Sequence, residues 1–169
     1  MTDPITLRHV QAGDLPAIAE IMAAEHVNLG TQRLPFHSDS ALAARIGDDA
    51  AKVKIVAVIE GRVAGYGELE TWPDRPRLAH GGEIDMVAVH PEFRGRGVGP
   101  RLLDAMIDMA DRWLNLRRLQ LYVWDGNDRA IALYEAAGFE IEGRLRDYVF
   151  VDGGYRDALV MARLVKRQV

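Results

Sequence analysis

The chain has 169 residues, no cysteine and a net charge of −4, from 21 Lys and Arg against 25 Asp and Glu. This length suits one domain with a core that needs no disulfides, so we expect a single domain over residues 1–169. The acidic balance argues against nucleic acid or an anionic membrane as partner, and the lack of cysteine excludes thiolate chemistry. Because no leader-like segment opens the chain and no apolar run could span a membrane, we predict a cytoplasmic protein.

The first half of the chain predicts a strand, two short helices and a β-hairpin. Apolar residues alternate at the start and then recur at helical spacing behind Asp14, which we expect to cap the first helix. Ser38 is placed to begin a second helix, and residues 60–62 separate two β-rich runs as a hairpin turn would. Residues 26–36 contain a glycine and a proline, and we expect them to be irregular. The expected elements are a strand at 5–9, helices at 14–22 and 38–46, and strands at 55–59 and 63–69.

The second half alternates strands with helices. After a proline-containing loop at 71–82, an apolar strand leads through a glycine-rich turn into an amphipathic helix, whose apolar stripe, including Trp113, we expect to pack against the sheet. A further strand and helix follow, and Gly138 is expected to end that helix. The expected elements are strands at 83–89 and 118–124, helices at 101–114 and from 127, and strands at 139–144 and 155–162. This order predicts an α/β fold with about seven strands and about four helices.

The turn between the fourth strand and its helix has the composition of a phosphate cradle. Glycines can adopt positive φ and let successive N–H groups converge on an anion, and the helix that follows adds unpaired N–H groups and the positive end of its dipole. Its spacing fits neither the P-loop nor the dinucleotide fingerprint, and a purely structural turn is the competing interpretation. Pro100 lacks an N–H, so the donors should come from residues 94–99 and the next turn. The turn reads Arg94, Gly95, Arg96, Gly97, Val98 and Gly99.

Two patterns in the second half resemble those of one enzyme superfamily. The first pattern is Arg94, Gly97 and Gly99, and the second is Asn127, Ala130, Tyr134, Ala137, Gly138 and Phe139. Together they resemble the GNAT superfamily of N-acetyltransferases, and further features resemble its bacterial L-amino acid N-acetyltransferases. The resemblance implies the GNAT fold with a mixed, mostly antiparallel central sheet. It also implies that acetyl-CoA is the co-substrate, and that an acetyl group passes directly to the primary amine of a small molecule, a free L-amino acid by preference.

The resemblance also implies roles for three side chains in catalysis. Tyr134 would be the general acid for the coenzyme A sulfur, although a tyrosine at this place in a helix is more often part of the core. Glu83 and Asp85 alternate on the fourth strand and point to the same face, so either could be the general base. A chain of waters could replace both carboxylates, and both could be ordinary surface charges.

The coenzyme would contact the fourth strand, the glycine turn and the helix beyond the fifth strand. The strand's main chain would pair with the amides of the pantetheine arm, as one strand pairs with another. Arg94 and Arg96 are suited to phosphate by their forked donors, and Asn127 would either contact the pantetheine arm or cap its own helix. The strand residues in question are Val87, Ala88 and Val89.

An amino acid acceptor needs a cation for its carboxylate as well as a base for its amine. Arg33, Arg75 and Arg77 lie in loops expected to border the acceptor site, and Phe36 and His37 could contact the acceptor's side chain. The sequence does not choose among them, and each could be a plain solvated residue. The histidines lack metal-ligand spacing, so we predict no metal, and a homodimer is a possible assembly.

Other acceptors and another class of function stay open at this point. The same chemistry could serve a protein N-terminus, a polyamine or an amine-bearing antibiotic, and a polyamine would favour an acidic pocket where an amino acid favours a basic one. The chain could also be a coenzyme A binding or sensing module without turnover.

Overall fold

A seven-stranded sheet runs through the structure, a computed structural model that describes residues 4–165. The strand order is β1-β2-β3-β4-β5-β7-β6, and every neighbouring pair is antiparallel except β4 with β5, which is parallel. This confirms the mixed, mostly antiparallel sheet. The strands are β1 (Thr6–His9), β2 (Lys52–Ile59), β3 (Arg62–Thr71), β4 (Gly81–Val89), β5 (Arg118–Trp124), β6 (Glu140–Val151) and β7 (Gly154–Leu164).

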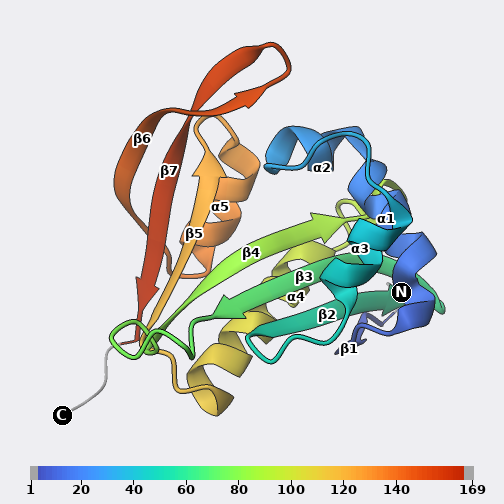
Figure 1. Cartoon of the computed structure of the whole chain (residues 1–169), viewed down its shortest axis with the longest axis horizontal. Coiled ribbons are helices and arrows are strands. Elements are labelled where there is room, and N and C mark those ends of the chain that lie inside the picture. Colours follow the sequence, from blue (N-terminus) through green and yellow to red (C-terminus); the bar gives the residue numbers. More distant parts are fainter. Residues whose placement is uncertain (1–3, 166–169) are drawn as a thin grey trace.

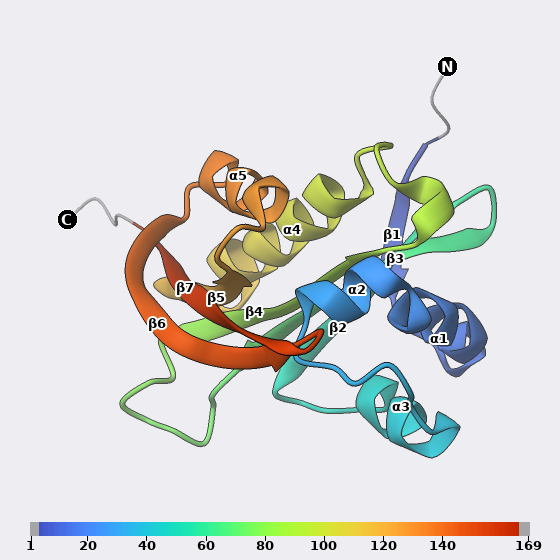
Figure 2. The same cartoon turned by 90° about the horizontal axis from the view of Figure 1, so that it is seen from above.

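Helices cover both faces of the sheet, with α4 and α5 on one face and α1 and α3 on the other (Figure 2). On the first face, buried residues of α4 such as Leu103 and Met106 pack on the sheet, and the glycines of β3 let the helix approach closely. On the second face, α1 and α3 bury Ile18 and Leu42 against β2, β3 and β4. The α-helices are α1 (Leu15–Ala23), α2 (Glu25–Gly30), α3 (Asp39–Ile46), α4 (Val98–Asp108) and α5 (Asp128–Ala136).

The helix α2 corrects the prediction that residues 26–36 are irregular for residues 26–30, whereas residues 31–36 do lie outside any helix or strand. Gly30 is the last residue of this short helix, so the glycine ends the helix and does not prevent it. Tertiary packing stabilises the helix, because Val27 is buried in the core cluster beside α1. The described chain therefore has five α-helices where about four were expected.

Two local predictions were wrong in detail. Asp14 does not cap α1 with its side chain; its carboxylate accepts from the Gln11 N–H at 2.8 Å and pairs with Arg8 at 2.7 Å, and the Arg8 hydrogen bond lowers the pKa of Asp14. Trp113 is 70% exposed, although the sequence placed it on the buried stripe. The last turn of its helix, Met109–Trp113, is a π-turn. Because a π-turn takes in an extra residue, the helical spacing no longer predicts which side chains face the sheet.

Other local signals are confirmed by the geometry of the helix ends. The Ser38 hydroxyl accepts from the Ala41 N–H at 3.2 Å at the start of α3, and Gly138 has φ of +88° just beyond α5. The fourth strand begins slightly earlier than expected, at Gly81.

The parallel pair β4 and β5 separates along its length, and this opening positions the functional site. Pairing is confined to residues 81–83 of β4 and 118–120 of β5. Beyond Glu83 the two strands diverge like the arms of a V, with α2 above the far end of β4 (Figure 1). The main-chain groups along the rest of this β4 edge therefore have no strand partner.

Candidate active site

The open edge of β4 carries main-chain groups that suit an extended ligand. The His90 N–H donates to the Ala64 carbonyl of β3 at 2.9 Å. Since successive residues of a strand direct their N–H and C=O groups to opposite edges, Val87 and Val89 direct theirs to the open side, whereas Ala88 directs its own toward β3. Val87 and Val89 thus offer the donors and acceptors that the predicted pairing with a pantetheine arm requires.

The Val89 carbonyl on this edge already accepts a hydrogen bond from a histidine, for which the sequence analysis predicted no role. His26 of α2 contacts the Val89 carbonyl through Nε2 at 2.9 Å. Because a carbonyl only accepts, Nε2 carries the proton and donates. Burial lowers the pKa of His26, and the positive charges of Arg94 and Arg129 lower it further, so the ring is neutral near pH 7. The Val87 carbonyl and the N–H groups of Val87 and Val89 remain for a ligand.

The glycine turn presents free amides at the start of α4. Gly95 and Gly97 have φ of +78° and +81°, in the left-handed region that favours glycine. The N–H groups of Arg94 and Arg96 donate to the carbonyls of Pro91 and Phe93, just before the turn, at 3.4 Å each, and are therefore not available to a ligand. In the described chain, the amides of four other residues of the turn have no main-chain acceptor, which makes them the available anion donors. These residues are Gly95, Gly97, Val98 and Gly99.

The open edge and the turn border one cavity of about 640 Å³. Arg94 and Arg129 line it and supply positive charge, whereas Arg96 does not line it and stacks over the Phe93 ring at 5.3 Å. Asn127 lines the cavity and also caps α5, because its side chain accepts from the N–H of Ala130 at 3.3 Å. Free amides beside arginines, next to an unpaired strand edge, fit a diphosphate attached to a chain of amides, as in coenzyme A.

A second cavity of about 610 Å³ adjoins the first and shares Tyr134, Tyr122 and Val87 with it. We call the second cavity the acceptor cavity, because three of the predicted acceptor residues line it. Arg75 and Arg77 line neither cavity and are exposed in the loop between β3 and β4. The three that do line it are Arg33, Phe36 and His37.

An aromatic wall borders the acceptor cavity. The Tyr122 and Tyr148 rings stack 5.7 Å apart with an interplanar angle of 8°, and Trp124 lies 6.3 Å from Tyr148. Tyr148 comes from a break in the pairing of β6 with β7, which lies between Leu145 and Val149. A flat apolar wall of this kind suits the side chain of a small acceptor.

The two candidate bases both line the acceptor cavity, but their environments differ. Pairing of β4 with β3 passes from Met86 to Ile84, so Asp85 is the extra residue of a β-bulge. The Asp85 carboxylate forms an ion pair with Arg45 of α3. Glu83 forms no ion pair in the described chain and accepts a hydrogen bond from the Gln120 amide at 3.1 Å. Burial raises the pKa of Glu83, which the charge of Asp85 raises further.

Tyr134 stands where the two cavities meet. Its ring packs edge-on against Phe139, with centroids 6.0 Å apart, at the border of the core. Burial raises the pKa of Tyr134 to about 12. The phenol is therefore protonated at neutral pH and can act as a proton donor toward either cavity.

Arg33 is the free cation of the acceptor cavity. Its guanidinium makes no ion pair or hydrogen bond with another described side chain, and its Nε is buried without a partner. Burial lowers the pKa of Arg33, and the nearby charge of Arg45 lowers it further. A half-buried guanidinium whose Nε has no partner is costly unless an anion satisfies it.

Comparison with known proteins identifies the family. The model of the Acetyltransferase (GNAT) family matches residues 15–139, most of the chain. The chain belongs to the GNAT acetyltransferases. It is an acetyl-CoA-dependent N-acetyltransferase, and the fold and the co-substrate implied by the sequence are thereby confirmed.

Relatives of this GNAT domain act on different amines. It is 36% identical over 160 residues to the L-amino acid N-acetyltransferase AaaT of Escherichia coli K12, covering 95% of this chain and 98% of that protein. The spermidine N(1)-acetyltransferase of the same organism is 33% identical over 67% of this chain and 59% of its own length. A Sinorhizobium meliloti phosphinothricin acetyltransferase solved with acetyl-CoA superposes with a TM-score of 0.85 at 29% identity, covering 98% of this chain and 89% of that one.

Several sequence predictions for this GNAT domain stay predictions. No helix of the described chain is long and apolar enough to cross a membrane, and no three His, Asp or Glu side chains among residues 4–165 are grouped to hold a metal ion. The single domain, the cytoplasmic location, the homodimer and the absence of nucleic-acid, membrane and metal partners are still expectations.

Sequence reasoning gave no site role to His26 or to the aromatic wall, and it missed three further polar residues of the GNAT site. Arg45 gave no signal beyond its place in the last turn of a short helix, and Gln120 is an inconspicuous residue of β5. Arg129 lies inside the Asn127 motif and could have been noticed there as a cation next to the helix start.

Gly97→Ala tests the glycine turn. Alanine is strained at φ of +81° and would turn the α4 amides away, so we expect the Kd for coenzyme A to rise about tenfold, measured by isothermal calorimetry. Gly153→Ala is the matched control, because Gly153 has φ of +75° in the β6–β7 turn and lines neither cavity. Equal affinity in the two variants would contradict the assignment of the turn.

Proposed function

We propose that this enzyme acetylates the α-amino group of a free L-amino acid. The supporting observation is a pair of groups in the acceptor cavity, one guanidinium and one carboxylate, neither of which forms an ion pair in the described chain. Arg33 would bind the acceptor's carboxylate, and Glu83 would face its ammonium. The pair matches a zwitterion, whereas a polyamine would bring a second positive charge toward Arg33. The similarity to the L-amino acid N-acetyltransferase AaaT over nearly the whole chain adds support.

In this proposal Glu83 is the general base. An α-amino group titrates near about 8, so at neutral pH most of it is an ammonium that cannot attack a carbonyl. Glu83 has the half-buried position and raised pKa of a carboxylate suited to accept that proton, and Gln120 orients it. Asp85 is the weaker candidate, because its carboxylate is already held by the Arg45 guanidinium and is not free to face the acceptor's amine.

Tyr134 would act as the general acid. Acetyl-CoA supplies the acetyl group as a thioester, and the departing sulfur needs a proton. Tyr134 lines both cavities, and its hydroxyl is protonated over the whole neutral range, so it can serve as the donor there. The open edge of β4 would hold the pantetheine arm alongside, which brings the thioester to the same place.

The acceptor class is tested by thiol release from acetyl-CoA with amino acids, spermidine and peptides as acceptors. We expect turnover with free amino acids and little with spermidine. Arg33→Gln should raise the KM for amino acids about 10- to 100-fold by removing the carboxylate's partner. Arg77→Gln, in an exposed loop away from the cavity, is the matched control. A larger loss in Arg77→Gln, or preference for spermidine in the wild type, would contradict the proposal.

Glu83→Gln should lower kcat/KM by about 10²- to 10⁴-fold near pH 7. In the wild type, kcat/KM should fall as the pH drops through the raised pKa of Glu83, which lies above the ordinary carboxyl value of 4.5. The variant should lack that acid limb and recover as the pH approaches the pKa of the free amine. Glu140→Gln, an exposed carboxylate of β6, serves as control. An unchanged pH profile in Glu83→Gln would remove Glu83 from the mechanism.

Tyr134→Phe should lower kcat by about 10²-fold. The Kd for coenzyme A should change little, because the ring and its packing on Phe139 are kept. Single-turnover measurement of thiol release separates this loss from slow product release. Full activity in Tyr134→Phe would assign the tyrosine to the core alone.

A further inference from the structure

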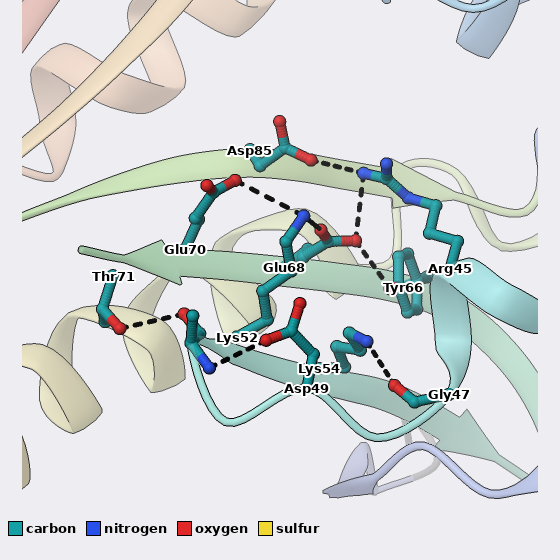
Figure 3. A network of polar contacts seen from close by, with 11 residues as sticks. Arg45, Gly47, Asp49, Lys52, Lys54, Tyr66, Glu68, Glu70, Thr71 and Asp85 are labelled. Carbon is teal, nitrogen blue, oxygen red and sulfur yellow. Dashed lines mark hydrogen bonds and ion pairs between the residues drawn. The ribbon is translucent and has the colours of Figure 1, made fainter. Parts of the chain in front are cut away.

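A chain of charged side chains links Lys52 of β2, Glu68 of β3, Arg45 of α3 and Asp85 of β4 (Figure 3). Its last member, Asp85, lines the acceptor cavity. Its central link is Arg45, which comes from the last turn of α3 and lies over β3 and β4. One terminal nitrogen, Nη2, contacts both Glu68, at 3.0 Å, and Asp85. A single guanidinium nitrogen therefore joins a buried carboxylate to one that borders the cavity.

Glu68 fixes this guanidinium in place. Its side chain is fully buried, and its other partners are the Lys52 ammonium at 2.7 Å and the Tyr66 hydroxyl at 2.8 Å. Burial and the adjacent Glu68 charge raise the pKa of Tyr66, so the phenol stays a donor. A buried carboxylate persists only when it is fully paired. Arg45 is thus held by an anchor that is independent of the cavity.

The ion pair with Arg45 decides the charge of the acceptor cavity. Four charged side chains line it, Arg33, Arg45, Glu83 and Asp85, and the pairing of Arg45 with Asp85 leaves one free cation and one free carboxylate. Without the charge of Arg45, Asp85 would become a second free carboxylate beside Glu83. The cavity would then have a net negative charge and would favour an acceptor with two ammonium groups.

We infer that Arg45 is a specificity-determining residue, which neutralises Asp85 and thereby keeps the cavity matched to a zwitterion rather than a polycation. This inference rests on the proposed function. Glu68 is the positioning residue for Arg45. Discrimination between the two acceptor classes therefore depends on a side chain that needs no contact with the acceptor, through the charge balance of the cavity.

The first test is Arg45→Gln in the full-length enzyme, with kcat/KM measured for L-methionine and for spermidine. We expect the ratio of the two values, amino acid over polyamine, to fall at least about tenfold, because a unit charge is lost beside the acceptor site. Arg45→Lys, which keeps the charge, should retain most of the ratio. Arg112→Gln, which breaks an exposed ion pair with Asp108, is the matched control.

Asp85→Asn should shift the same ratio in the opposite direction. It removes a carboxylate that is 30% exposed, so it tests the inference even if Arg45→Gln folds poorly. The double variant Arg45→Gln/Asp85→Asn loses one charge of each sign, and its ratio should return to within about threefold of the wild type. Thermal melts establish that each variant is folded.

The outcomes separate this inference from the proposed function. If the wild type acetylates amino acids but Arg45→Gln and Asp85→Asn leave the ratio unchanged, or shift it in the same direction, the inference is wrong and the proposed function stands. If the wild type acetylates no amino acid, the proposed function fails. Calorimetry of spermidine binding to the coenzyme-loaded protein then still tests the charge balance, since Arg45→Gln should bind spermidine more tightly than the wild type. Equal binding would overturn the inference.

Discussion

The separation of β4 from β5 is the constraint on which the site depends. If β4 and β5 stayed paired, the N–H and C=O groups of Val87 and Val89 would form hydrogen bonds with β5, and no ligand could reach them. Because pairing stops at Glu83, the edge beyond it is free for an amide chain, and the glycine turn at the end of β4 offers its free amides to the charged end of the same ligand. The two cavities adjoin around Tyr134 for the same reason, since both occupy space that the missing strand pairs would fill.

The packing of α3 on the sheet, on the face opposite α4, sets the charges around the acceptor cavity. The helix α3 brings Arg45 over β3 and β4, where buried Glu68 holds it and Asp85 meets it. The β-bulge turns Asp85 toward this arginine while Glu83 keeps Gln120 as its neighbour. Two carboxylates on one strand therefore have different chemistry, one ion-paired and the other half-buried with a raised pKa.

Local signals predicted much of the fold, and they failed where packing overrides them. The Ser38 helix cap, the hairpin turn and the helix end at Gly138 each depend on a few adjacent residues, so the local sequence is enough to predict them. The helix α2 and the π-turn at the end of α4 depend on contacts that the local sequence does not describe, and Trp113 was misplaced for this reason. Arg75 and Arg77 were predicted as acceptor-binding residues, but neither lines a cavity, because the path of their loop depends on tertiary structure.

By itself the sequence determined the family, and it supplied the candidate coenzyme loop and the candidate catalytic residues, because short motifs of fixed spacing carry these signals. The tertiary structure decided which members of that set share a cavity and which are neutralised. Arg33 and Glu83 line one cavity, Asp85 pairs with Arg45, and His26 donates a hydrogen bond to Val89, although the members of each pair are far apart along the chain. Such contacts depend on how helices and strands pack, and no local pattern encodes them.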